Sequence, residues 1–309
     1  MQVTTKKWIE AFGKRDVRAL SRLISLAENA DPDALAALEA LGRPAKPTKV
    51  VGITGPPGAG KSSLINSFIQ TLRRGSDRVA VLAVDPTSPV SGGAVLGDRI
   101  RMSEHFEDPN VFIRSVSTRG RLGGVSLATP QSVALCESFG FDWLFLESVG
   151  IGQNEIEVSR WSDVTVLVLT PDSGDGIQAI KAGVLEVADV ILVNKNEAGR
   201  GEAFYRELEA TFHESKKKMP ALFLTSEKDP ASREAAAQGI ASWFQKNQAL
   251  LKERRAGMAQ RFARVLIENH GEQGLTKWLA AQKGTDPYAL YRSYLALGHW
   301  PASIAGDGK

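Results

Sequence analysis

The residues best suited to chemistry form a glycine-rich segment, Gly55-Pro-Pro-Gly-Ala-Gly-Lys61-Ser62, which matches the pattern G-x-x-x-x-G-K-[ST]. Glycines in such a loop allow successive backbone N–H groups to point into one concavity and surround a phosphate. A helix that starts at Lys61 adds the positive end of its dipole. We expect Lys61 to reach the β and γ phosphates and the Ser62 hydroxyl to bind magnesium. The motif predicts a P-loop nucleoside triphosphatase.

Three acidic residues are candidates for the magnesium side of this site. Asp85 and Glu147 each follow a short apolar run that is expected to be a strand. Because ligands bind at the carboxyl ends of parallel strands, both acids are predicted, with Ser62, to be magnesium ligands. The alternative is that each acid only caps the next turn. Asp98 ends the glycine-rich stretch Gly92–Asp98, which is expected to become ordered when the γ-phosphate and magnesium bind. Asp98 is therefore predicted to be both a metal ligand and a catalytic residue.

A second glycine-containing loop, Ser148-Val-Gly-Ile-Gly-Gln153, follows Glu147 directly. Gln153 could orient an attacking water, as a glutamine does in some GTPases, or could serve only as a hydrogen-bonding residue of the loop. The predicted catalytic residues are Lys61, Asp98 and Gln153.

The base of the nucleotide is predicted from Asn194-Lys195-Asn196-Glu197, which follows the apolar run Val190–Val193. Guanine-specific proteins usually carry N-K-x-D here, and the acid accepts hydrogen bonds from guanine groups that adenine cannot supply. Glu197 keeps the charge but is one methylene longer, so GTP and GDP are the expected ligands. Thr225, Ser226 and Glu227 follow a later apolar run and are expected to complete the pocket. The predicted nucleotide contacts are Gly55, Pro56, Pro57, Gly58, Ala59, Gly60, Lys61, Ser62, Ser63, Glu147, Asn194, Lys195, Glu197, Thr225, Ser226 and Glu227.

These residues need a scaffold, and the pattern between Lys49 and about Leu250 supplies one. Short apolar runs alternate with helical stretches, which predicts an α/β fold with three layers, in which helices cover both faces of a mainly parallel sheet. The expected strands are Val50–Thr54, Val79–Val84, Val111–Ile113, Trp143–Leu146, Val164–Leu169, Val190–Val193 and Ala221–Leu224.

Helical segments flank this P-loop GTPase domain, which is assigned to residues 49–250. Residues 1–48 are predicted to be an N-terminal extension of two helices, the second beginning at Asp31-Pro32-Asp33, and Gly42–Pro47 is expected to be a linker. Residues 251–309 show helical periodicity with many aromatic residues. This arm is expected either to pack against the main domain or to form an interface with a second copy.

Composition narrows the function further. The chain has 309 residues, a net charge of +3, one cysteine and four histidines. A charge this small gives no argument for binding nucleic acid or a membrane surface, and one cysteine excludes an internal disulfide framework. The N-terminal residues lack the apolar core of a signal peptide, and no apolar run is long enough to span a bilayer. The protein is expected to be cytoplasmic.

With these motifs in place, the chain resembles the GTPases associated with methylmalonyl-CoA mutase, the MeaB/ArgK group. The resemblance covers nearly the whole chain, and its glycine-rich block at 92–102 is more specific than a P-loop alone. The matching segments are Gly52–Ser62, Ala80–Pro86, Gly92–Met102, Phe112–Arg114, Leu122–Val125, Glu147–Gln153 and Val187–Lys195, with Asp16–Ser25 near the N-terminus.

The resemblance implies a Ras-like core of the SIMIBI class and a homodimer formed by the C-terminal arm. It implies binding of GTP and Mg²⁺, slow hydrolysis by the isolated protein, and association with an adenosylcobalamin-dependent acyl-CoA mutase. In that complex the family gates cofactor loading and protects the mutase, so a chaperone role follows. Asp85, Asp98 and Glu147 fall on the family's magnesium and switch positions, and Pro171–Gly183 resembles a further switch segment.

Departures from the family pattern leave the client open. Glu197 replaces the usual aspartate, Ser148 replaces a usual threonine, and Glu268–Gly284 matches poorly. The mutase could be the methylmalonyl enzyme or a relative. Two alternative functions are a metallochaperone GTPase, which would need a histidine tract or clustered cysteines, and a P-loop ATPase with a different client.

Overall fold

A computed structural model describes residues 2–42, 46–85, 102–117, 128–148, 154–171, 184–214 and 219–276. Several predicted features lie outside these ranges: Asp98, Gln153, most of the Pro171–Gly183 segment and the C-terminal arm beyond Thr276. The side chain of Asp85 is likewise outside the description, although its backbone ends a strand.

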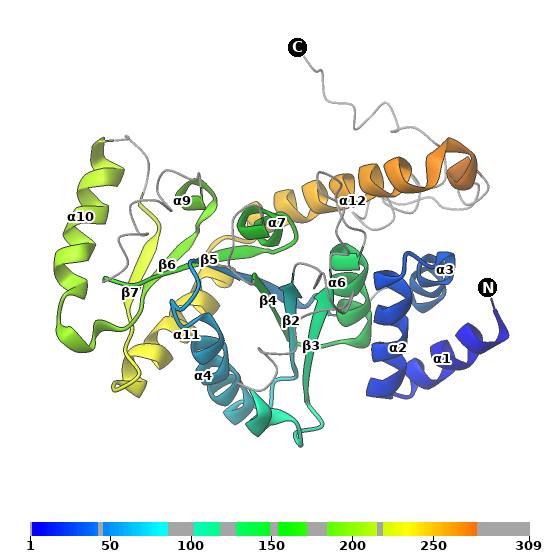
Figure 1. Ribbon diagram of the computed structural model, residues 1–309, viewed down its shortest axis with the longest axis horizontal. Coiled ribbons are helices and arrows are strands. Elements are labelled where there is room, and N and C mark those ends of the chain that lie inside the picture. The colour runs from blue at the N-terminus through cyan, green and yellow to red at the C-terminus, as the bar shows by residue number, and fades with distance from the viewer. Residues whose placement is uncertain are drawn as a thin grey trace, which may run out of the picture.

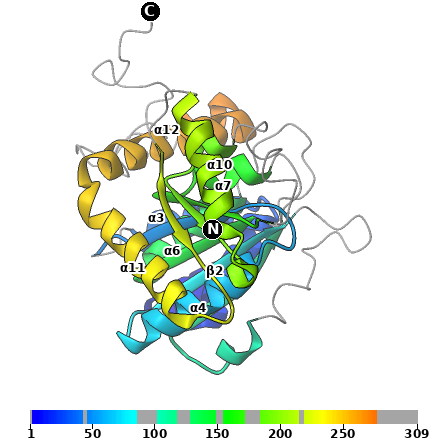
Figure 2. The ribbon, with the colours of Figure 1, turned by 90° about the vertical axis from the view of Figure 1, so that its left-hand side faces the viewer.

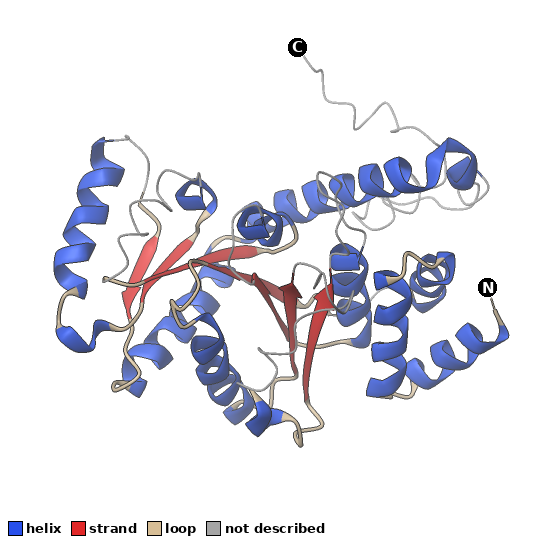
Figure 3. Cartoon of the chain, in the orientation of Figure 1, coloured by secondary structure: helices blue, strands red, loops and turns tan. Residues whose placement is uncertain are grey.

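The centre of the fold is a seven-stranded sheet in the order β3-β2-β4-β1-β5-β6-β7, with every neighbouring pair parallel. The predicted α/β class is confirmed, and Figure 3 shows the twisted sheet in red between helices. The β3 strand runs four residues beyond its predicted end at Ile113. The strands are β1 Lys49–Thr54, β2 Val79–Asp85, β3 Val111–Ser117, β4 Trp143–Ser148, β5 Val164–Leu169, β6 Val190–Val193 and β7 Ala221–Leu224.

Helices cover both faces because the strands are apolar on both sides. Neighbouring residues of β1 show this, since Val50 packs into one core cluster and Val51 into another. Figure 1 shows α4 (Lys61–Arg74) and α11 (Pro230–Lys246) on one face. The opposite face carries α6 Ala128–Phe139, α7 Asn154–Arg160, α9 Val184–Val187 and α10 Gly201–Glu214.

The N-terminal extension contains three helices, so the prediction of two was wrong. They are α1 Val3–Gly13, α2 Val17–Glu28 and α3 Pro32–Leu41. The missed break lies at Arg15, whose φ is +64°, and at Asp16, whose side chain accepts a hydrogen bond from the Arg18 N–H at 2.8 Å. An aspartate in this role satisfies a free N–H group at the start of a helix and thereby marks a helix boundary.

The extension is fastened to the sheet through an arginine of the edge strand β3. Arg114 donates to the Ser21 carbonyl at 2.6 Å and to the Ser25 hydroxyl at 2.9 Å, and it forms an ion pair with Glu28. Glu28 also accepts a hydrogen bond from the Ser117 N–H at 3.0 Å. One face of α2 therefore covers the outer edge of β3.

The helix α12, Gln248–Thr276, is anchored to the sheet by two consecutive arginines. Arg255 makes two hydrogen bonds to the fully buried Asp163, at 2.7 and 2.6 Å, and donates to the Thr48 carbonyl at 2.6 Å. Arg254 binds both carboxylate oxygens of Asp189, at 2.6 and 2.8 Å. Since Thr48, Asp163 and Asp189 directly precede β1, β5 and β6, α12 holds the amino ends of three strands.

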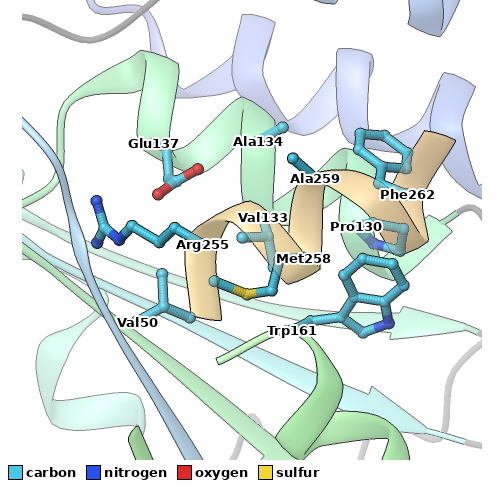
Figure 4. A pocket seen from close by; sticks show the side chains of 10 residues that line it. All are labelled: Val50, Pro130, Val133, Ala134, Glu137, Trp161, Arg255, Met258, Ala259 and Phe262. Atoms are coloured by element: carbon cyan, nitrogen blue, oxygen red, sulfur yellow. The ribbon is translucent and has the colours of Figure 1, made fainter. Parts of the chain in front are cut away.

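A mainly apolar pocket lies between α12 and α6, beside this anchor (Figure 4). Met258, Ala259 and Phe262 of α12 face Pro130 and Val133 of α6 across it. Trp161 closes one side, with its ring 6.1 Å from that of Phe262 in an edge-on arrangement. The start of α12 at Gln248 means that the predicted boundary at residues 250 and 251 falls inside this helix, and the division into three units stays a prediction. Within the described ranges, no helix combines the length and the apolar character needed to cross a membrane.

Candidate nucleotide-binding site

The loop between β1 and α4 has the backbone that a phosphate cradle requires. Gly55, Gly58 and Gly60 have φ values of +141°, +76° and +90°, and residues other than glycine rarely adopt this region of backbone conformation. A Cβ atom at Gly55 would lie 2.1 Å from the Val168 carbonyl oxygen. Only glycine fits at that position, so the sequence of the loop is dictated by its path against β5.

Lys61 begins α4 and lies across this loop. Its side chain is 7% exposed, and its Nζ donates to the carbonyl oxygens of Gly55 at 2.8 Å and Pro56 at 3.1 Å. Pro57 and Gly58 are exposed at the tip, while Ala59 is buried beneath it. The ammonium is therefore held at the loop where the sequence predicts the phosphates.

Ser62 and Glu147 form the acidic side of the candidate site. The Ser62 hydroxyl donates to Oε1 of Glu147 at 2.8 Å, and these residues are 5% and 2% exposed. Hydroxyl and carboxylate oxygens are the ligands that Mg²⁺ prefers, so this pair fits the predicted ion. Residue 85 ends β2, the strand that pairs with β4 through Val84 and Ser148, and its backbone therefore lies at the same edge. Asp98 and Gln153 lie outside the described residues, so their predicted roles stay predictions.

Asn194 links the phosphate loop to the predicted base-binding segments. Its Nδ2 donates to the Ala59 carbonyl at 2.9 Å, and its Oδ1 accepts from the Thr225 hydroxyl at 3.0 Å. A Cβ atom at Gly60 would lie 2.3 Å from the same Nδ2, which explains the glycine there. Lys195 follows with a φ of +61° and is exposed. Three segments far apart in the sequence thus meet at one side chain.

Glu197 is held by the loop that follows β7. Its Oε1 accepts hydrogen bonds from the Ser226 hydroxyl at 2.9 Å and from the Glu227 N–H at 2.8 Å. Hydrogen bonds from its own backbone N–H, from Glu227 N–H and from Ser226 hold the pKa of Glu197 below its usual range. The side chain is therefore an ionised acceptor at neutral pH, as the recognition of guanine would require.

Three residues around the site, Ser148, Ser232 and Arg233, were not among the predicted site residues. The Ser148 hydroxyl donates to the Thr54 hydroxyl at 3.0 Å and ties β4 to β1 below the loop. Ser232 and Arg233, in the first turn of α11, hold the backbone of Ser226. The available signal was Asp229-Pro230, which predicts a helix start close behind Ser226, but the pairing itself depends on the tertiary fold.

A known sequence family and a solved structure are each similar to this chain over most of its length. The model of the family described as "Methylmalonyl Co-A mutase-associated GTPase MeaB" matches residues 20–272. A solved structure described as an LAO/AO transport system kinase has a TM-score of 0.68 and 25% sequence identity. That likeness covers 90% of this chain and 87% of the other, which supports the same fold over most of both proteins.

Two curated relatives show the range of the similarity. A protein of Pyrococcus horikoshii, named only as a candidate GTPase, is 47% identical over 200 residues, which are 65% of this chain and 63% of that protein. The mouse protein named methylmalonic aciduria type A homolog, mitochondrial, is 46% identical over 147 residues, which are 48% of this chain and 35% of its own. The chain thus matches less than two thirds of the length of either relative.

Proposed function

The chain belongs to the family of methylmalonyl-CoA mutase-associated GTPases, and on that premise we propose that it binds and hydrolyses GTP as a switch for an adenosylcobalamin-dependent acyl-CoA mutase. The observation that carries the nucleotide part is the connection through Asn194. This residue bonds to the phosphate loop on one side and to Thr225 on the other, beside the carboxylate of Glu197. One site with a phosphate end and a guanine end is what a GTPase needs.

In the proposed mechanism the protein positions the nucleotide and stabilises the negative charge on its phosphates, and it forms no covalent intermediate. The N–H groups of the Gly55–Gly60 loop and the ammonium of Lys61 bind the phosphates. Ser62, Glu147 and Asp85 hold Mg²⁺ directly or through its waters. Magnesium, when bound, neutralises negative charge on the β and γ phosphate oxygens. Asp98 and Gln153 are proposed to position the attacking water, and turnover by the isolated protein is expected to be slow.

Glu197 provides the first test of this function. A charged hydrogen-bond acceptor contributes about 1.5–3 kcal/mol, so Glu197→Ala should weaken GDP binding roughly 10- to 100-fold and leave ADP binding unchanged. The measurement is calorimetric titration of the protein with GDP and with ADP in magnesium buffer. Glu197→Asp is the control, because it restores the usual acid and should keep the preference for GDP. Equal binding of GDP and ADP by the unaltered protein would contradict the guanine assignment.

The partner is proposed from the family to which the chain belongs and from the mouse relative, whose name links it to methylmalonic aciduria. We propose that the complex gates loading of adenosylcobalamin and protects the mutase, and that the C-terminal arm forms a homodimer. The chain itself would carry the nucleotide and the mutase would carry the cobalamin.

Addition of purified methylmalonyl-CoA mutase is expected to raise the GTP turnover of the protein, since a bound partner can position or supply groups that stabilise the transition-state charge on the phosphates. The two proteins should also co-elute in size-exclusion chromatography, to an extent that differs between GDP and a non-hydrolysable GTP analogue. A related mutase acting on another acyl-CoA is tested in parallel. If neither mutase alters turnover or co-elutes, the proposed partnership is wrong. The binding of guanine nucleotide is tested separately, by the titration with GDP and ADP.

A further inference from the structure

The 226–227 loop, which donates hydrogen bonds to Glu197, is in turn bound by residues in the first turn of α11. The backbone N–H of Ser226 donates to the Ser232 hydroxyl at 3.2 Å, and the Ser226 carbonyl accepts from Nε of Arg233 at 2.8 Å. Both backbone groups of Ser226 are therefore bound by consecutive residues of one helix. The Ser226 hydroxyl is left to face Glu197, to which it donates at 2.9 Å.

Arg233 makes a second contact that reaches the phosphate side of the site. Its Nη1 donates to the hydroxyl of Ser67 at 2.5 Å, and that hydroxyl donates to the Ser63 carbonyl at 3.2 Å. Ser67 lies on α4, the helix that starts with Lys61 and Ser62. Figure 2 shows α4 and α11 side by side, as in Figure 1. One half-buried guanidinium thus joins the base-side loop to the phosphate-side helix.

This bridge matters because the acid at position 197 is a glutamate. Its side chain is exposed and has one more rotatable bond than aspartate, so its carboxylate needs contacts besides its own backbone N–H to hold one position. Two such contacts come from donors of the 226–227 loop, both of which bond to the same oxygen, Oε1. The place of that loop relative to the phosphates depends in turn on what fixes the Ser226 backbone.

We propose that Arg233 is a positioning residue for guanine: by joining Ser226 to Ser67, it sets the place of the Glu197 carboxylate relative to the phosphate-binding helix. The proposal rests on the guanine-nucleotide function proposed above and adds a residue outside the nucleotide pocket. The planar guanidinium holds two N–H donors at a fixed spacing, one for the Ser226 carbonyl and one for the Ser67 hydroxyl. The ammonium of a lysine is a compact charge on a flexible chain and does not fix two donors in this way.

Replacement of Arg233 by methionine is expected to weaken GDP binding about tenfold, the effect of losing one charge-assisted hydrogen bond to the loop. Binding of inorganic pyrophosphate in magnesium buffer should stay within about twofold, because the phosphate loop keeps its own contacts. Arg233→Lys should show the same loss of GDP affinity. Arg74→Met is the matched control, since Arg74 pairs with Glu234 at 3.7 Å between the same two helices without touching the loop.

A double-mutant cycle with Glu197→Ala distinguishes positioning from general support of the fold. If Arg233 acts through Glu197, then Arg233→Met should change GDP affinity by less than about twofold in the Glu197→Ala background. The proposal is overturned if GDP and pyrophosphate binding fall together, if Arg233→Lys binds GDP as the unaltered protein does, or if the tenfold loss persists without Glu197. Equal binding of GDP and ADP by the unaltered protein would instead overturn guanine recognition itself. GDP affinity that is unchanged in Arg233→Met overturns only the role of Arg233.

Discussion

Methionine in place of Lys61 is expected to lower GTP turnover by at least about 100-fold, the scale of losing one preorganised charged donor to the reacting group. Lys61 is 7% exposed and sits against the Gly55 and Pro56 carbonyls, so its ammonium has little freedom to move away from the phosphate loop. The measurement is phosphate release under saturating GTP and magnesium.

The control for this variant is Lys49→Met, at the start of β1, the strand that leads into the phosphate loop. The Lys49 ammonium lies 4.2 Å from the centre of the Trp143 ring, at the edge of the sheet opposite the loop. Its replacement should leave turnover unchanged within about twofold. Turnover in Lys61→Met that stays within about tenfold of the unaltered protein would show that Lys61 is not part of the catalytic site.

Loss of Arg255 is expected to cost about 3–5 kcal/mol in the free energy of unfolding, because it would leave the Asp163 carboxylate buried without its cation. Asp163 is fully buried, and Arg255 supplies two hydrogen bonds to it. The experiment is a urea titration of the Arg255→Met variant and of the unaltered protein, with unfolding monitored by circular dichroism. Adding Asp163→Asn should recover part of the loss, since asparagine removes the charge and can still accept from the Val50 N–H, as Asp163 does at 3.0 Å.

An exposed ion pair gives the comparison. Lys46 and Asp142 are 2.7 Å apart, but the lysine side chain is 71% exposed, so Lys46→Met should cost less than about 1 kcal/mol. Similar losses for Lys46→Met and Arg255→Met would contradict the view that burial of Asp163 makes the α12 anchor important. That view would also be contradicted if Asp163→Asn failed to recover any stability in the Arg255→Met protein.

The sheet and the phosphate loop could be predicted from the sequence because their signals are local. Strands buried on both faces are continuous apolar runs, and the loop needs glycine where its backbone adopts positive φ. The extension of β3 to Ser117 was missed because Arg114 interrupts the apolar run. Its two terminal nitrogens donate hydrogen bonds to α2, about ninety positions earlier in the chain, and no local sequence pattern indicates that contact.

The candidate site divides in the same way. Asn194 directly follows β6, and Lys61 and Ser62 end the glycine-rich motif that follows β1, so the order of the segments was enough to nominate them. Arg233 follows no motif, because its importance depends on how α11 packs against α4. The boundary between α1 and α2 is a different kind of miss. An aspartate that caps a helix was present at Asp16, but the apolar periodicity around it was read as one helix.

The contact between α2 and β3 has a consequence for how the protein behaves in concentrated solution. An edge strand offers a row of N–H and C=O groups to any other extended chain, and uncovered edges promote aggregation. Glu28 already occupies the N–H of Ser117, and Arg114 draws α2 over the same edge. The N-terminal helices therefore protect this side of the sheet from strand addition, so that a shortened chain lacking them would aggregate more readily even with its nucleotide site intact.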